Sequence, residues 1–130
     1  MAPRSVRLVL PFPPSANTSW RVFRNRLILS ASGRKYRETV SQEVSEADLD
    51  APLEGRLRIT VSLHRGDRRR YDCDNNLKPL LDALEHAYVF LDDEQVDELH
   101  VYKREVRPRE GCVVVTISEL EEEESASPDG

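Results

Sequence analysis

The sequence has little cysteine and no long hydrophobic run, and each absence excludes a class of protein. It contains two cysteines, Cys73 and Cys112, which form no CxxC pair. A disulfide framework and a zinc ribbon are therefore excluded, and a reducing cytoplasm is the compartment that fits best. No apolar run approaches the roughly 20 residues of a membrane helix, and Pro11 interrupts the first apolar segment. We therefore expect neither a signal peptide nor a membrane partner.

Three common catalytic signatures are also absent from the sequence. It has no GxxxxGK[ST] loop, no GxGxxG turn and no GxSxG elbow. Nucleotide-driven motors, Rossmann dehydrogenases and serine hydrolases therefore lose their main sequence support. The chain has 130 residues, of which 38% are hydrophobic and 33% are charged. This composition fits one folded domain of ordinary size.

Charges of opposite sign are segregated along the chain. Residues 1–40 carry eight basic side chains and one acidic one, whereas residues 119–130 carry six acidic side chains and no basic one. The net charge of −5 depends on that tail, because the rest of the chain has 18 acidic and 19 basic residues. Arginine outnumbers lysine 16 to 3, and arginine binds phosphate through paired hydrogen bonds. The charges alone are equally compatible with a polyanionic partner and with an ordinary solvated surface.

The acidic tail, residues 119–130, is expected to be separate from the folded domain, residues 1–118. Its lack of aromatic residues and its repeated glutamates favour a solubilising extension without fixed structure. The alternative is a DNA mimic that competes for the basic surface formed by residues 1–40 and 65–70. Deletion of such a competitor would tighten DNA binding most at low salt.

Hydrophobic periodicity predicts an α+β domain with one mixed β-sheet and two main helices. The clearest strand is residues 56–64, where apolar and polar side chains alternate. Residues 11–15 are rich in proline, which lacks the amide donor of a strand, so this segment is expected to be a loop. The expected strands are residues 5–10, 27–29, 56–64, 96–106 and 112–120, and the first helix is expected to run from a Ser30 or Ser32 cap to about Ala47.

The second helix is predicted from leucines at helical spacing up to Tyr88. Its expected first residue is Asn75 or Asn76. If Asn76 is the cap, Pro79 falls in the first turn, where its missing N–H costs little. The two final strands are joined by a turn with Gly111, and we expect them to form a hairpin or to lie side by side.

The segment RRRYDCDNNLK, residues 68–78, carries the candidate chemistry. On an extended chain the carboxylates of Asp72 and Asp74 point to the same side, where they repel each other. A hard divalent cation such as Mg²⁺ removes that conflict and keeps positions open for phosphate oxygens. Lys78, about one helical turn further on, can neutralise a phosphate or a leaving oxygen. The combination predicts metal-assisted phosphodiester hydrolysis, with the preceding arginines attracting a polyanion.

This segment also has two other interpretations. Asp74 can cap the helix without any metal, and this alternative stays open. A calcium-binding loop is excluded because its required glycine is Leu77 and its twelfth position is Ala83.

A second acidic group, Asp92, Asp93 and Glu94, follows the second helix. Acidic residues at this position usually form a solvated turn. A helix of about 14 residues also carries the chain roughly 20 Å away from Asp74. Asp93 must therefore be brought back by the fold or supplied by a second subunit if it acts with Asp74.

The histidines and the single tryptophan give weaker signals. His64, His86 and His100 lack the mutual spacing of metal ligands, so we interpret them as strand or helix-surface residues. Trp20 lies in an arginine-rich stretch, where it either stacks on a base or packs in the core.

The chain resembles the RusA family of Holliday-junction resolvases in three blocks that, with their spacing, cover about residues 6–120. The central block and the Leu-Asp-Asp block are the specific ones. The first block is Leu10-Pro11-Phe12-Pro13-Pro14-Ser15 with Asn17, the second is Arg68-Arg69-Arg70 with Asp72, Asp74, Asn75, Lys78 and Asp82-Ala83-Leu84, and the third is Leu91-Asp92-Asp93 with Gln95-Val96.

The resemblance implies a small homodimeric, Mg²⁺-dependent endonuclease, often encoded by a prophage, that nicks two opposed strands of a four-way DNA junction symmetrically. Mn²⁺ is expected to substitute for Mg²⁺. By position, the family's essential carboxylates correspond to Asp72, Asp74 and Asp93, which are the expected metal ligands, and its essential lysine to Lys78. Asp92 corresponds to a neighbouring, less critical acid. The activity implied is that of a crossover junction endodeoxyribonuclease in DNA recombination and repair.

The candidate DNA contacts come from the basic regions of the chain. Two other functions remain possible from the sequence: a catalytically silent module that binds branched DNA, and a metal-dependent phosphodiesterase for small substrates. Intact acidic residues favour an enzyme over a silent binder, and the basic regions favour a long polyanion as substrate. The candidate contacts are Arg68, Arg69, Arg70, Asn17, Arg21, Arg24, Arg34 and Lys35.

Overall fold

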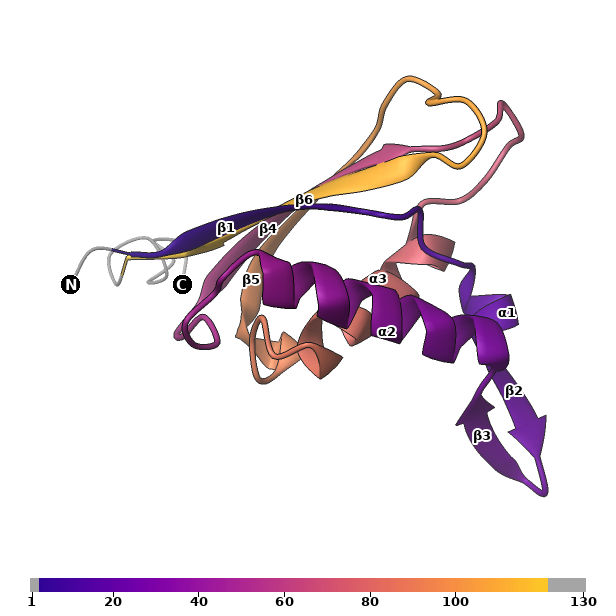
Figure 1. Cartoon of the computed structure of the whole chain (residues 1–130), viewed down its shortest axis with the longest axis horizontal. Coiled ribbons are helices and arrows are strands. Elements are labelled where there is room, and N and C mark those ends of the chain that lie inside the picture. Colours follow the sequence, from indigo (N-terminus) through magenta and orange to yellow (C-terminus); the bar gives the residue numbers. More distant parts are fainter. Residues whose placement is uncertain (1–2, 122–130) are drawn as a thin grey trace.

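The computed structural model describes residues 3–121, and it has a four-stranded mixed sheet with its helices on one face (Figure 1). A separate two-stranded hairpin, β2–β3, projects beyond the N-terminal end of α2. The predicted α+β class is confirmed. The elements are β1 (Ser5–Leu10), α1 (Ala16–Ser19), β2 (Trp20–Phe23), β3 (Arg26–Leu29), α2 (Ala31–Glu46), β4 (Leu57–His64), α3 (Asp74–His86), the 3₁₀ turn η1 (Asp93–Gln95), β5 (Val96–Lys103) and β6 (Cys112–Glu119).

The core lies between the sheet and the helices α2 and α3. Strand β4 supplies its centre, because Leu57, Ile59, Val61 and Leu63 are fully buried while the residues between them are partly exposed. Burial of such aliphatic side chains stabilises a fold by roughly 1.5–3 kcal/mol each before the entropy of ordering them is subtracted. The helices cover this face with Tyr36, Val40 and Val44 from α2 and Leu80, Ala83 and Leu84 from α3.

The strand order β1-β6-β4-β5 places β4 between the two final strands. Strand β4 pairs with β5 in parallel and with β6 antiparallel. The prediction of a β5–β6 hairpin or of neighbouring strands is therefore wrong. Helix α3 connects β4 to β5 and returns the chain to the end of the sheet at which β4 begins. Parallel neighbouring strands need such a crossover connection. The segment after β5 then passes the end of β4 to reach β6.

The chain between β1 and α2 is more regular than predicted. A single helical turn, α1, is capped by Ser15, whose side chain accepts a hydrogen bond from the backbone N–H of Thr18. Strand β2 follows directly and pairs with β3, of which only residues 27–29 were predicted. Ser30 caps α2, as expected, by accepting from the N–H of Gly33 at 3.2 Å.

Helix α3 begins at Asp74, with Cys73 as its N-cap residue. Pro79 therefore lies inside the helix and is buried, so its expected place in the first turn is wrong. Glu119, expected at the start of the acidic tail, belongs to β6, while residues 122–130 lie outside the described residues. Across residues 3–121, no helix is long and apolar enough to cross a membrane. Both cysteines are free thiols.

Candidate active site

Asp72 and Asp74 lie at the entrance of α3, and both are exposed. The intervening Cys73 has helical dihedral angles, φ −63° and ψ −32°, and the N–H of Asn75 donates to the carbonyl of Asp72 at 3.1 Å. The expected extended conformation is wrong, because the chain already turns here to begin the helix. Asp74, in the first helical turn, is favoured by the positive end of the helix dipole.

The proline loop is held by one hydrogen bond from the start of α3 and one from α2. The side-chain amide of Asn76, which is 5% exposed, donates to the carbonyl of Pro13 at 3.0 Å. The hydroxyl of Tyr36 on α2 donates to the carbonyl of Pro11 at 2.8 Å. Burial raises the pKa of Tyr36, so the phenol stays neutral and remains a donor. The site therefore has a rigid wall beside its acidic residues.

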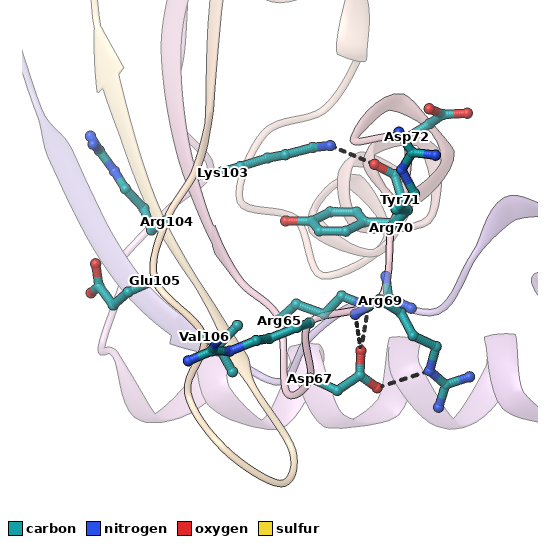
Figure 2. A pocket seen from close by; sticks show the side chains of 11 residues that line it. Arg65, Asp67, Arg69, Arg70, Tyr71, Asp72, Lys103, Arg104, Glu105 and Val106 are labelled. Atoms are coloured by element: carbon teal, nitrogen blue, oxygen red, sulfur yellow. Dashed lines mark hydrogen bonds and ion pairs between the residues drawn. The ribbon is translucent and has the colours of Figure 1, made fainter.

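Aromatic rings and cations pack together at the proline loop, where Phe12, Tyr71 and Arg65 line one hollow. The rings of Phe12 and Tyr71 meet edge to face, with their centroids 5.8 Å apart. The Arg65 guanidinium lies 4.6 Å from the Tyr71 centroid, and the Lys103 amine lies 4.4 Å from it. Lys103 also donates a hydrogen bond to the Tyr71 carbonyl, and the Tyr71 ring lies between the two cations in Figure 2. Burial raises the pKa of Tyr71. These contacts hold positive charge close to Asp72.

A groove of about 1010 Å³ runs past Asp72, and a second hollow of about 500 Å³ adjoins it. Both are lined by Arg65, Arg70, Tyr71 and Asp72. The larger groove has six basic and three acidic side chains in its lining, so it favours a polyanion. That lining is Arg65, Asp67, Arg68, Arg69, Arg70, Tyr71, Asp72, Lys103, Arg104, Glu105 and Val106 (Figure 2).

Lys103 and Arg104 were not among the predicted DNA contacts. They lie at the end of β5, and only the parallel pairing of β5 with β4 brings them to residues 65–70, the arginine loop. A basic pair at the end of a β-rich run was the only available signal, and it does not indicate which strand lies alongside.

The arginine loop is ordered by the carboxylate of Asp67. This group accepts from the backbone N–H of Arg69 at 3.0 Å and from the Nε atoms of Arg65 and Arg69. The backbone hydrogen bond and the two arginines lower the pKa of Asp67, although its partial burial opposes them. Arg68 and Arg70 line the same groove.

Lys78 lies one turn into α3, and its amine is 4.7 Å from the centroid of the Trp20 ring. The half-buried indole therefore contacts the predicted catalytic lysine. The other predicted DNA contacts, Arg21, Arg24, Asn17, Arg34 and Lys35, are exposed on the hairpin, on α1 and on the first turn of α2.

Asp93 lies at the opposite end of α3 from Asp72 and Asp74. Its backbone N–H donates to the carboxylate of Glu85 at 3.0 Å, and Glu85 follows Asp74 by eleven residues of helix, or about 16 Å. The carboxylates of Glu85, Asp92 and Asp93 offer oxygens that lie within 4.8 Å of one another, a group that could hold a metal ion. Within one chain the structure brings Asp93 to Glu85, and not to Asp72.

Gln95 fixes the turn that carries Asp93, a role that the sequence analysis missed. Its side-chain oxygen accepts from the N–H groups of Leu91 and Asp92 at 3.0 and 3.1 Å. Its side-chain nitrogen donates to the carbonyls of Leu53 and Gly55 at 3.2 and 3.0 Å. The spacing of an aspartate and a glutamine three residues later is that of a capping box, and it was the signal that could have identified this clamp.

Comparison with known proteins identifies the family that this architecture belongs to. The family model described as Endodeoxyribonuclease RusA matches residues 11–118. The chain belongs to the RusA family. The crossover junction endodeoxyribonuclease of Enterobacteria phage HK97 is 44% identical over 115 residues, which are 88% of this chain and 95% of that protein. The corresponding protein of Escherichia coli K12 is 40% identical over 113 residues, 87% and 93% of the two chains. The predicted resemblance and the nuclease class are confirmed.

Proposed function

We propose that this protein is a homodimeric, Mg²⁺-dependent endonuclease that resolves four-way DNA junctions by paired, symmetric nicks during recombination and repair. One observation carries the proposal: a groove with six basic side chains is also lined by Asp72 in a chain of the RusA family. The names of the relatives point to crossover junctions as the substrate. Basic side chains that contact phosphates position the DNA, and the carboxylates then act on one phosphodiester.

The donor set suits a hard divalent cation. Asp72, Asp74 and Asp93 offer only carboxylate oxygens, which Mg²⁺ and Mn²⁺ prefer over the nitrogen and sulfur ligands of softer metals. Bound there, Mg²⁺ would polarise the scissile phosphate and lower the pKa of an attacking water. The exposed amine of Lys78 supplies positive charge for a phosphate or for the leaving oxygen. Asp72, which lines the groove, would hold the ion beside a DNA backbone bound there.

A complete site in this proposal needs two chains. Ligands of one Mg²⁺ bind it at about 2.1 Å, so their oxygens lie within a few ångströms of one another. Asp93 is held beside Glu85, about 16 Å along α3 from Asp74. We therefore propose that Asp93 of one subunit joins Asp72 and Asp74 of its partner. A two-fold dimer then contains two equivalent sites, one for each nick.

The decisive experiment uses a synthetic four-way junction and a linear duplex of the same sequence, each with and without Mg²⁺ or Mn²⁺. We expect paired nicks on the junction alone and only with metal. Asp72→Asn should abolish nicking while junction binding remains. The matched control is Asp48→Asn, an exposed acid at the far end of α2 whose φ of 60° asparagine tolerates.

Three outcomes would contradict the proposal. Near-normal nicking by Asp72→Asn would show that this carboxylate is not essential. Tight junction binding without any nicking in either metal would favour the silent binding module. Metal-dependent hydrolysis of a small phosphodiester without action on the junction would instead favour the third function.

A further inference from the structure

The hairpin β2–β3 carries an apolar face that nothing in the described chain covers at its tip. The register pairs Val22 with Leu27 and Trp20 with Leu29, so these four side chains share one face. At the base, Trp20 and Leu29 are half-buried, but Val22 is 72% exposed and Leu27 is 67% exposed. The hairpin projects away from the sheet and helices (Figure 1). An exposed apolar face on a projecting ribbon indicates a partner.

The turn of the hairpin presents an aromatic ring together with a cation. Phe23 is 53% exposed, and the Arg24 guanidinium lies 5.3 Å from its ring centroid. The two turn residues, Arg24 and Asn25, have φ of 51° and 63°. Such two-residue turns favour glycine, asparagine or aspartate at both positions. An arginine in this unfavourable position indicates that the tip requires its side chain rather than an easily formed turn.

The charge of the hairpin selects a polyanion as that partner. Its ten residues, 20–29, include Arg21, Arg24 and Arg26 and no acidic residue. At its base, Trp20 contacts the amine of Lys78, so the hairpin is continuous with the proposed active site. A second copy that paired hairpin to hairpin would place its own arginines against these. DNA instead offers phosphates for the arginines and base faces for the apolar side chains.

We propose that the hairpin inserts into the branch point of the DNA junction, an inference that rests on the proposed function. In an uninterrupted duplex the base faces are stacked and unavailable. At a branch point the stacking is broken, and an apolar side chain can occupy the space, as wedge residues do between base steps. Phe23 stacks on an exposed base at the tip, Val22 and Leu27 contact a base on the opposite face of the ribbon, and the arginines contact the flanking phosphates.

The test uses a junction with 2-aminopurine beside the branch point and another with the same base inside one arm. Binding is measured without divalent metal, and a denaturing gel checks that the DNA stays intact. We expect the wild-type protein to change the fluorescence at the branch point only. Phe23→Ala and the double variant Val22→Ser/Leu27→Ser should lose that change and bind the junction at least about fivefold more weakly, given what one stacked base contributes. Phe23→Trp should retain both.

The controls separate this inference from the proposed function. Val9→Ser, at a valine that is 50% exposed on the sheet face opposite the helices, should behave as wild type. Normal affinity and normal 2-aminopurine signal for Phe23→Ala, with wild-type protein still nicking the junction, would overturn insertion alone. Absence of nicking by the wild-type protein would overturn the proposed function. A change from dimer to monomer in the hairpin variants, seen by light scattering, would show that a second copy occupies the hairpin and would also overturn insertion.

Discussion

A mixture of two inactive variants gives the sharpest test of a site shared between subunits. Asp72→Asn and Asp93→Asn should each abolish nicking on their own. If Asp93 acts across the dimer, a mixed dimer has one site with both wild-type carboxylates and one site with neither. Activity should then reappear when the two inactive proteins are mixed and allowed to exchange subunits. If both residues acted within one chain, every site in the mixture would lack a carboxylate.

The expected magnitude follows from the two-fold symmetry of the proposed dimer. Random exchange gives about half mixed dimers, each with one of two sites intact, so about a quarter of the wild-type sites return. Each mixed dimer can cut only one strand of a junction. On a plasmid with an extruded cruciform, the mixture should therefore produce nicked circles, whereas the wild-type protein produces linear molecules. No recovery after verified subunit exchange would refute the shared site and require Asp93 to reach Asp72 within one chain.

Two further predictions concern single side chains. Gln95→Leu removes four hydrogen bonds around the turn that carries Asp93, and it should reduce nicking of preformed complexes at least about tenfold, with a smaller effect on junction affinity in a binding titration. The isosteric Gln95→Glu keeps the acceptor oxygen and loses only the N–H donor, so it should lose less activity; equal losses in the two variants would contradict a role for the hydrogen bonds that the side-chain oxygen accepts. Burial tends to raise the pKa of Glu119, but hydrogen bonds, two of them from Arg4, outweigh burial and lower that pKa. The ionised carboxylate therefore stabilises the fold above the unfolded-state pKa, and this stabilisation is lost as pH falls through the folded-state pKa. Glu119→Gln should lower the free energy of unfolding by about 1–2 kcal/mol at pH 7, a difference that shrinks below about pH 4; a pH-independent difference in urea titrations would contradict the assignment.

Much of the fold follows from local sequence patterns. The alternation in β4 and the leucine spacing in α3 each reflect one buried face, so the pattern and the structure agree. The order of the strands could not be predicted in this way, because no local pattern encodes which strand lies beside β4. Of the two-stranded hairpin only β3 was predicted in part, because β2 has no buried face that would produce a clean alternation of apolar and polar residues.

The candidate site likewise has one part that the sequence predicts and another part that depends on the fold. Asp72, Asp74 and Lys78 were predicted because they lie close together in sequence and carry the chemistry of a metal nuclease. Lys103 joins them only through the pairing of β5 with β4, which short-range spacing does not reveal. Locating Asp93 required the structure, which shows the length of α3 and the contact of Asp93 with Glu85. The sequence left open whether Asp93 reaches Asp74 through the fold or from a second subunit.

The length of α3 bears on how such an enzyme avoids cutting ordinary DNA. The helix places Asp74 at one end and Asp93 near the other, so in the proposed arrangement a single chain has no complete site. Catalysis then depends on a dimer, and each dimer presents its two sites at a spacing and orientation fixed by the same pair of helices. A linear duplex can occupy one groove but does not offer two symmetrically placed strands. Selectivity for a branched substrate would thus arise from the geometry of assembly as much as from any direct contact with bases.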